Sequence, residues 1–556
     1  MPRSIDRIVA AAVYHHARRA YRRFRHAAAN ATAVQQRVLH RKLALNADSD
    51  FGRDHHFDRI KNYRDFAANV PVRDYEYYKP YIEQAKRGRT HALLGSRQRL
   101  LMFALTSGTT DQPKFIPVTK AFLRDYRSGW TVFGVKMFMD HRDAVLRPIL
   151  QVTSPMDEFT TDAGTPCGAI TGLMAATQKR LVRRYYASPL EPAHIADATA
   201  KYYTIMRLAI PRDVAFIITA NPATQLRLAS VADEHRDLLI RDIHDGALTH
   251  DLPIEPHIRN RLEPSLQPDP HLARRLERLV AEHDALLPRH YWRLSFLANW
   301  IGGTLGLYLR QLPRYFGDLP VRDIGLLASE GRMSVPLTDG TAAGVLDFQH
   351  NFFEFVPADQ IESSQPDVLR SGELQIGEEY FVLLTTASGL YRYDIRDRVR
   401  VVDYLGQAPV IEFLHKGAHV SSMTGEKLTE RQVVHAVQQL SQQLGLTIES
   451  FVLAPRWADP PFYRLHVETA HLPSNLSGDR ICRQLDDALS QANIEYRSKR
   501  QTGRLGPLQL NLLPDGCLAR LDRQTSQRRG RAEQFKHQFL YTTPDADDHL
   551  PLAPNP

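Results

Sequence analysis

Apolar runs typical of β-strands alternate with longer helical stretches from Met102 to about Val410, and this alternation constrains the fold more than any other feature. Strands separated by helices usually form βαβ units, in which the strands pair in parallel and the helices cover the sheet. The sequence therefore predicts an α/β domain with a mainly parallel sheet. The β-rich runs lie at Val145–Val152, Val214–Thr219, Ile324–Leu327 and Phe381–Thr385.

The segments on either side of this region have other patterns. Ala-rich apolar spacing predicts helix from Ile5 to about Ala47. The C-terminal part predicts an α+β arrangement with helices Glu430–Leu444 and Asp479–Asn493 and strands Ser450–Ala454, Arg464–Glu468 and Pro507–Leu513. A chain of 556 residues is too long for one ordinary core. We therefore predict a large α/β N-terminal domain, residues 1–420, and a smaller α+β C-terminal domain, residues 421–556, joined by a hinge.

One loop brings hydroxyl side chains together around a glycine. The apolar run Leu100–Leu105 leads into Thr106-Ser107-Gly108-Thr109-Thr110, and Lys114 follows a few residues later. Gly108 can adopt the positive φ angles that point successive backbone N–H groups at one spot. With the hydroxyls, these groups can hold the oxygens of a polyphosphate, and Lys114 would add a compact positive charge. The alternative is a polar surface loop, because Ser, Thr and Gly are ordinary turn residues.

Two acidic positions are candidates for metal and nucleotide contacts. Glu330 follows Ser329 after an apolar run, and a carboxylate at the end of a strand suits a Mg²⁺ ion that also contacts phosphate. A helix N-cap with a neighbouring acid is the alternative. Asp397 closes the segment Leu390–Asp397, where aromatic and charged residues alternate. Its two oxygens can bind a ribose diol. The alternative for this segment is a surface strand with ion pairs.

A glycine-rich turn and two lysines complete the candidate set. Trp300-Ile301-Gly302-Gly303-Thr304 reads as a strand-to-helix transition, and such a helix N-terminus can receive an anionic or carbonyl group. Close packing of strand and helix is equally compatible with it. Lys416, near the predicted hinge, can reach ribose or phosphate. Lys536 is a candidate to neutralise charge as pyrophosphate leaves, although a lone lysine is usually a surface residue.

The order of these motifs resembles the Gretchen Hagen family of acyl-acid amido synthetases, in its bacterial branch. The phosphate loop by itself resembles the first signature of the adenylate-forming enzyme superfamily. The resemblance covers nearly the whole chain. It is carried by Thr106-Ser107-Gly108-Thr109-Thr110, Pro113-Lys114, Ser329-Glu330, Tyr391-Arg392-Tyr393, Phe413-Leu414-His415-Lys416 and Gln534-Phe535-Lys536.

The resemblance implies a ligase that uses ATP and Mg²⁺ to convert a carboxylic acid into an acyl-adenylate. The acyl group would then pass to an amine, usually that of an amino acid. The resemblance also implies that the large domain performs the adenylation. In it, Glu330 would contact the metal and a phosphate, and Asp397 would contact the ribose. The other phosphate contacts would come from Thr106, Ser107, Thr109 and Thr110. This chain departs from the family pattern at Asp111 and Arg396, where a glycine is usual.

Two other functions share part of this evidence. An acyl-CoA ligase would perform the same first step, and a non-catalytic nucleotide- or nucleic-acid-binding protein would release no pyrophosphate. The net charge of +9 attracts anions, but no nucleic-acid-binding module accompanies it. We therefore expect small-molecule substrates, no nucleic acid and a monomer.

The hydrophobic pattern and the cysteines bear on where the protein works. The longest apolar stretch, Leu294–Leu309, is interrupted by Asn299, Gly302 and Gly303, so we expect no membrane span. The three cysteines are far apart and have no metal-binding or disulfide spacing. Unpaired cysteines are typical of a reducing compartment, so we expect a cytoplasmic protein.

Overall fold

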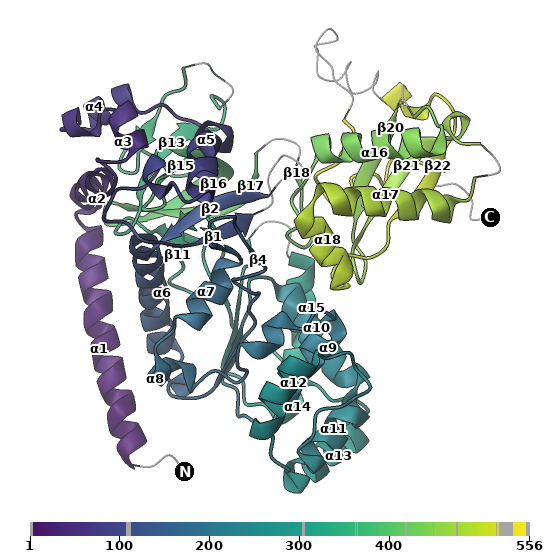
Figure 1. Ribbon diagram of the computed structural model, residues 1–556. Coiled ribbons are helices and arrows are strands. Elements are labelled where there is room, and N and C mark those ends of the chain that lie inside the picture. The colour runs from purple at the N-terminus through teal and green to yellow at the C-terminus, as the bar shows by residue number, and fades with distance from the viewer. Residues whose placement is uncertain are drawn as a thin grey trace. The chain divides into compact units, whose positions relative to one another are not determined.

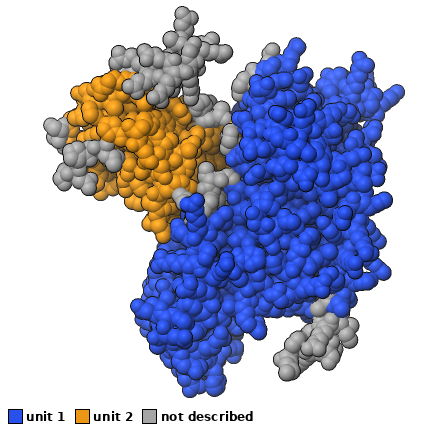
Figure 2. Space-filling model, turned by 180° about the vertical axis from the view of Figure 1, so that it is seen from behind, with its two compact units in different colours: residues 1–106, 115–416 blue, residues 107–114, 417–556 orange. Residues whose placement is uncertain are grey.

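The computed structural model describes residues 4–106, 113–302, 306–361, 363, 365–417, 420–448, 450–473, 476–518, 520–521 and 538–551. The chain divides into two compact units, which Figure 2 colours separately. The first contains residues 1–106 and 115–416, and the second contains residues 107–114 and 417–556.

The N-terminal region of the first unit is helical, as predicted, but it forms two helices. α1 (Ser4–Ala28) lies along α6 (Lys120–Asp140), and α2 (Ala31–Leu45) follows after a break at residues 29–30 (Figure 1). Lys42 on α2 donates to the Asp125 carboxylate on α6 at 2.5 Å, and the Lys42 side chain is fully buried. Because a buried charge is stable only when it is paired, this contact fixes α2 against α6.

The described part of the first unit contains three sheets of four or more strands. One is parallel throughout and has the order β3-β6-β7-β8, in agreement with the sequence prediction. Its strands are β3 (Ile149–Gln151), β6 (Phe216–Ile218), β7 (Phe296–Asn299) and β8 (Val321–Asp323). A second sheet has the order β2-β1-β5-β4, with β1 (Leu100–Thr106), β2 (Lys114–Thr119), β4 (Phe159–Thr160) and β5 (Pro166–Gly168).

The largest sheet contradicts the prediction of a mainly parallel arrangement. Its order is β11-β12-β17-β16-β15-β13-β14, and every pair in it is antiparallel. Most of its strands follow one another without an intervening helix, so the chain reverses between them. They are β11 (Ser334–Val335), β12 (Gly344–Leu346), β13 (Phe352–Pro357), β14 (Leu369–Arg370), β15 (Glu379–Thr385), β16 (Tyr393–Leu405) and β17 (Ala408–Lys416).

The predicted strand Ile324–Leu327 is also wrong. β8 ends at Asp323, and the next strand, β9 (Leu327–Ala328), begins only after Gly325. The φ angle of Gly325 is +92°, and a Cβ atom there would lie 2.4 Å from the Ser334 carbonyl oxygen. Only glycine adopts this conformation without strain, and it ends the extended run between two apolar residues.

The remaining described helices of the first unit lie beside these sheets or, from residue 198 to residue 291, gather at the lower end of the view in Figure 1. They are α3 (Asp50–Asp54), α4 (Tyr63–Asn69), α5 (Tyr75–Lys86), α7 (Ile170–Ala176), α8 (Arg180–Arg183), α9 (Ala198–Ala209), α10 (Pro222–Glu234), α11 (Arg236–Asp245), α12 (Pro256–Leu262), α13 (Pro270–His283), α14 (Pro288–Tyr291) and α15 (Gly306–Phe316). No described helix is long and apolar enough to span a membrane.

Aromatic side chains from distant parts of the sequence form the centre of the first unit's core. The Phe51 ring packs 5.4 Å from that of Tyr78 and 5.7 Å from that of Tyr391, and all three are fully buried. The Tyr391 hydroxyl donates to the carbonyl oxygen of Lys42 (2.8 Å) and accepts from Asn46 (2.9 Å). The segment before β16 is therefore anchored to the end of α2 by packing and by satisfied hydrogen bonds.

The second unit is an α+β fold, and its main elements confirm the sequence prediction. β20 (Phe451–Arg456) and β21 (Phe462–Glu468) pair antiparallel, and β22 (Gln509–Leu513) joins β21 in parallel. α16 (Glu430–Leu444) and α17 (Gly478–Ala492) pack together and are accompanied by α18 (Ile494–Gln501) (Figure 1). Two short strands, β18 (Val420–Ser421) and β19 (Leu428–Thr429), precede α16.

Candidate active site

The phosphate-loop candidate connects two neighbouring strands. Thr106 is the last residue of β1 and Lys114 is the first residue of β2, and the two strands are adjacent in their sheet. Ser107, Gly108, Thr109 and Thr110 lie outside the described residues. β2 is held in place at its start, because the Phe115 N–H donates to the hydroxyl of Tyr75 at 2.9 Å.

Glu330 is the most informative of the predicted site residues. It lies with Ser329 in the tight turn between β9 and β10 (Gly331–Arg332), whose strands pair through Ala328 and Gly331. Only 4% of Glu330 is exposed, yet it makes no hydrogen bond or ion pair with any described residue. Burying a carboxylate without a partner costs free energy, so the position calls for an explanation, and a bound ligand provides one.

The charge of Glu330 affects the pKa values of residues on other elements of the first unit. Burial raises the pKa of Tyr393, at the start of β16, well above its ordinary value, and the negative charge of Glu330 raises it further. Burial also raises the pKa of Tyr75, and the negative charge of Glu330 adds to that rise. The Tyr393 hydroxyl is buried without a hydrogen bond to any described residue. The charge of Glu330 therefore acts on Tyr75, which supports β2, and on Tyr393.

Asp397 and Lys416 occupy facing positions on adjacent strands. In the β16–β17 ladder, Asp397 is directly opposite Lys416, and Asp397 is 5% exposed. The preceding residues do not form a surface strand, since Tyr391, Arg392 and Tyr393 are all buried. The surface-strand interpretation of this segment is therefore wrong.

The substrate-site candidate begins at the end of β7. The Trp300 ring lies 5.1 Å from that of Phe413 on β17, the same strand that ends with Lys416. Phe413 of β17 thus contacts Trp300, and Lys416 of the same strand pairs with Asp397. Gly303 and Thr304 lie outside the described residues, as does Lys536 in the second unit. Gly302 is buried, and a Cβ atom there would lie 3.0 Å from the Trp300 indole nitrogen.

The comparisons with known proteins agree along most of the chain. Sequence models of the GH3 family match it in three consecutive parts: the N-terminal domain at residues 20–321, the central domain at 344–416 and the C-terminal domain at 431–545. The chain belongs to the GH3, or Gretchen Hagen, family. The first of these matches alone covers more than half of the sequence.

The curated relatives are plant GH3 proteins. The chain is 24% identical over 559 residues to an indole-3-acetic acid-amido synthetase, GH3.10 of Arabidopsis thaliana, covering 92% of this chain and 93% of the relative. It is 24% identical over 547 residues to the jasmonoyl–L-amino acid synthetase GH3.5 of Oryza sativa subsp. japonica, covering 91% and 92%. Among solved structures, the GH3.15 acyl acid amido synthetase superposes with a TM-score of 0.63 at 22% identity, covering 92% of each chain. The GH3 fold is therefore shared over 92% of each chain.

Asp323 was missed by the sequence prediction of the GH3 site. It ends β8, is 1% exposed, and accepts the backbone N–H groups of Ile301 at 2.7 Å and Gly325 at 2.5 Å. Burial raises the pKa of Asp323 to about 7, and these N–H donors act against that rise. Asp323 therefore ties the Trp300 turn to the segment that leads to Glu330. In the sequence, the only indication of Asp323 was a single acidic residue near the end of an apolar run.

Arg396 stands where the family usually has a glycine, and it adopts a backbone conformation typical of glycine. The φ angle of Arg396 is +61°, in the left-handed region that favours glycine. Its N–H donates to Asp394 Oδ1 and its Nε to Oδ2, both at 2.8 Å. The backbone thus keeps a glycine-like conformation, and Asp394 stabilises it.

We expect Arg396→Gly to leave the activity nearly unchanged and Asp397→Ala to raise the KM for ATP. Glycine relieves a left-handed conformation that costs about 1–2 kcal/mol for other residues, at the expense of one partly exposed ion pair. Steady-state kinetics of both folded variants test this. The reverse pattern, with a damaged Arg396→Gly and a normal Asp397→Ala, would show that another residue contacts the ribose.

Proposed function

We propose that this GH3 protein is an ATP-dependent ligase that joins a carboxylic acid to an amine, usually that of an amino acid, through an acyl-adenylate. The named relatives, which are indole-3-acetic acid-amido and jasmonoyl–amino acid synthetases, support the reaction class. The observation that carries the proposal is Glu330, a buried residue whose carboxylate has no partner among the described residues and whose charge acts on Tyr75, which supports β2.

The arrangement fits the chemistry of adenylation. A carboxylate is a poor electrophile, and attachment of AMP activates it without a nucleophile from the protein. Positioning and charge stabilisation then account for the rate. In this proposal Thr106, Ser107, Gly108, Thr109 and Thr110 hold the phosphates. Asp397 and Lys416 position the ribose, and the acid binds at Trp300, Gly302, Gly303 and Thr304.

We propose Mg²⁺ as the accompanying ion, with Glu330 as its protein ligand and Ser329 beside it. No group of three or more His, Cys, Asp or Glu residues in the described part of the chain is placed to hold a metal. This agrees with Mg²⁺, which is usually held by one or two carboxylates together with substrate phosphates. When bound, the ion would neutralise phosphate charge.

Further parts of the proposal rest on the sequence resemblance. We assign Lys114 and Lys536 to charge stabilisation during adenylation. The functional division remains residues 1–420 and 421–556, and the branch is the bacterial one. The three cysteines are free, which supports a reducing cytoplasm. We also propose that the protein acts as a monomer.

The decisive experiment is acid-dependent release of pyrophosphate across a panel of carboxylic acids, with the product mass read afterwards. An amide that forms only when acid, ATP and amino acid are all present supports the proposal. A thioester that forms with coenzyme A would identify an acyl-CoA ligase instead. Nucleotide binding without pyrophosphate release for any acid would identify a binding protein.

We expect Thr109→Ala to lower kcat/KM for ATP by about 10- to 100-fold, because a hydrogen bond to a charged group contributes about 1.5–3 kcal/mol. Thr109→Ser, which keeps the hydroxyl, is the matched control and should retain most of the activity. Kinetics at saturating acid and amine, together with the melting temperatures of both variants, test this. Equal activity of the two variants would remove Thr109 from the phosphate contacts.

A further inference from the structure

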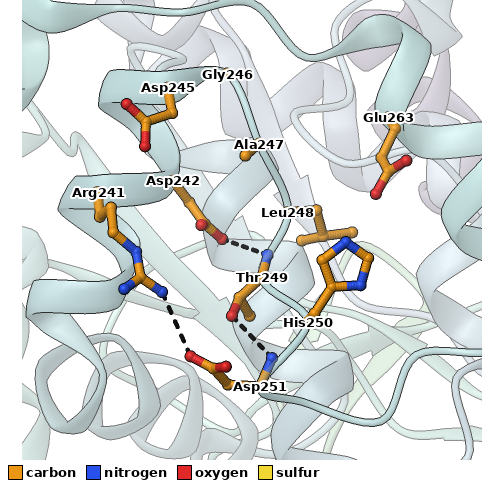
Figure 3. Close-up of a pocket in the computed structure, with 10 residues that line it drawn as sticks. All are labelled: Arg241, Asp242, Asp245, Gly246, Ala247, Leu248, Thr249, His250, Asp251 and Glu263. Carbon is orange, nitrogen blue, oxygen red and sulfur yellow. Dashed lines mark hydrogen bonds and ion pairs between the residues drawn. The ribbon is translucent and has the colours of Figure 1, made fainter.

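The helical part of the first unit contains two neighbouring cavities of opposite character. The smaller, of about 480 Å³, follows the C-terminal end of α11 and is drawn in Figure 3. Its acidic groups largely have partners already, since Asp242 accepts the Thr249 N–H at 2.7 Å and Asp251 accepts from Arg241 at 3.4 Å. The larger, of about 680 Å³, lies between the α8–α9 segment and residues 265–269.

Arginines dominate the larger cavity. Arg183, Arg184, Arg207 and Arg212 line it, against two carboxylates, Glu191 and Asp269. The Asp269 carboxylate is already engaged as an N-cap, because it accepts the Leu272 N–H at 2.9 Å. No ion pair joins any of the four arginines to a carboxylate among the described residues.

The guanidinium groups bond to neutral oxygens instead. Arg183 donates to the Ala176 carbonyl oxygen, Arg212 donates to those of Tyr186 and Arg184, and Arg184 donates to the Tyr185 hydroxyl. Carbonyl and hydroxyl acceptors orient a guanidinium but leave its positive charge in place. Four arginines against two carboxylates give the lining a net positive charge, although the Asp242 carboxylate also acts on Arg207.

Arg207, on α9, is the buried member of the group. It is 2% exposed, and its Nε and Nη2 donate to the carbonyl oxygens of Ala247 (3.0 Å) and Asp242 (2.9 Å), which line the smaller cavity. Its Nη1 makes no hydrogen bond to any described residue. Because Arg207 lines the larger cavity, this nitrogen is a candidate donor for a ligand there.

The position of the cavity separates it from the proposed active site. Its wall is attached to the start of the parallel sheet, since the Ala187 N–H donates to the carbonyl oxygen of Ile149, the first residue of β3, at 2.8 Å. The candidate site residues follow the opposite ends of the strands, after Asn299 of β7 and Asp323 of β8. In parallel sheets the carboxyl ends of the strands usually bind the substrate.

We propose that the arginine cavity is a second binding site, for a small anion that carries phosphate groups. Its volume lies in the range of about 300–1,000 Å³ that is typical of small-molecule sites. Planar guanidinium groups match phosphate oxygens in pairs, which makes arginine better suited to this task than lysine. We therefore assign the site a binding role.

Titration calorimetry of the full chain with inorganic pyrophosphate tests the proposal. The double variant Arg183→Gln/Arg184→Gln removes two exposed charges from the cavity rim. It should weaken one class of binding by at least about tenfold, as expected for lost charge-assisted contacts. The control Arg274→Gln/Arg278→Gln removes the same charge from exposed positions on α13 outside the cavity and should bind as the wild type does.

A second pair of variants tests the site without removing an arginine. Ser265 is exposed and lines the cavity. Ser265→Asp places a negative charge there and should weaken the same class of binding. Ser265→Asn introduces a side chain of nearly the same size as aspartate but without the charge, and it should retain the binding. Pyrophosphate bound at the nucleotide site would be unaffected by all of these changes. Absence of binding to the wild type at about 10 mM, or equal affinities of all variants, would overturn the proposal.

Discussion

Arg392→Met should lower the free energy of unfolding of the first unit by about 3–5 kcal/mol, the loss that follows when one member of a buried ion pair is removed. Arg392 is 5% exposed and Glu354 is 1% exposed, and Arg392 Nε donates to both oxygens of Glu354 at 3.0 and 3.2 Å. Burial raises the pKa of Glu354 and the charge of Arg392 opposes that rise, so the variant would leave this carboxyl without its counter-charge.

Arg392 also satisfies backbone groups of the N-terminal segment. Its Nη1 donates to the carbonyl oxygens of Ala67 (3.2 Å) and Val70 (2.9 Å), and Glu354 accepts from the Tyr63 hydroxyl at 2.8 Å. Methionine has a similar length but no donor, so these two carbonyl oxygens would also lose their partner. The expected loss is therefore larger than that of the ion pair alone.

Urea unfolding followed by tryptophan fluorescence measures the effect, because three of the four tryptophans, Trp130, Trp292 and Trp300, lie in the first unit. Arg370→Met is the matched control. Its ion pair with Glu373 is about half exposed and should contribute less than about 1 kcal/mol. The double variant Arg392→Met/Glu354→Leu should recover part of the loss. Similar losses for Arg392→Met and Arg370→Met would contradict the buried-pair interpretation.

The elements that could be predicted well from the sequence are those determined by local signals. α16 was predicted with its observed bounds, Glu430–Leu444. Thr429 and Gln432 form a reciprocal capping box at its start, and Gly445, with φ of +66°, ends it. Such signals lie within a few residues of the helix end, so a reading of the sequence can find them.

The large antiparallel sheet could not be predicted in the same way. β12 pairs with β17 through Val345 and Val410, which are far apart in the sequence, and no local pattern specifies that pairing. Similarly, Arg392 was read as part of a motif next to a ribose contact, with a surface strand as the alternative. Its buried pairing with Glu354 depends on two strands meeting in space, which only the fold reveals.

Site residues that belong to a short motif could be predicted from the sequence. Site residues whose role depends on contacts between distant segments could not. Glu330 and Asp397 were named from short motifs and the family resemblance. The role of Asp323 comes from two backbone N–H groups that belong to different segments, Ile301 and Gly325. A single aspartate at a strand end has many ordinary explanations in a sequence, so its function appears only once those segments are placed.

Glu330→Gln should lower kcat/KM for ATP by about 10²–10³-fold, a magnitude typical of losing one preorganised electrostatic contact. Glutamine keeps the size of the side chain and its polar oxygen but removes the charge. Since Glu330 has no described partner, the variant should not lose stability and can even gain some. A residue held for ligand binding shows this combination, whereas a structural carboxylate such as Glu354 loses stability when changed.

Pyrophosphate release measured over a range of Mg²⁺ concentrations gives the sharpest form of this test. If Glu330 holds the ion, Glu330→Gln should raise the Mg²⁺ concentration needed for half-maximal rate, and excess Mg²⁺ should recover part of the activity. Glu373→Gln, which changes an exposed carboxylate in the same unit, should leave both the rate and the Mg²⁺ requirement unchanged. A folded Glu330→Gln variant with wild-type kinetics at every Mg²⁺ concentration would exclude Glu330 from the metal site.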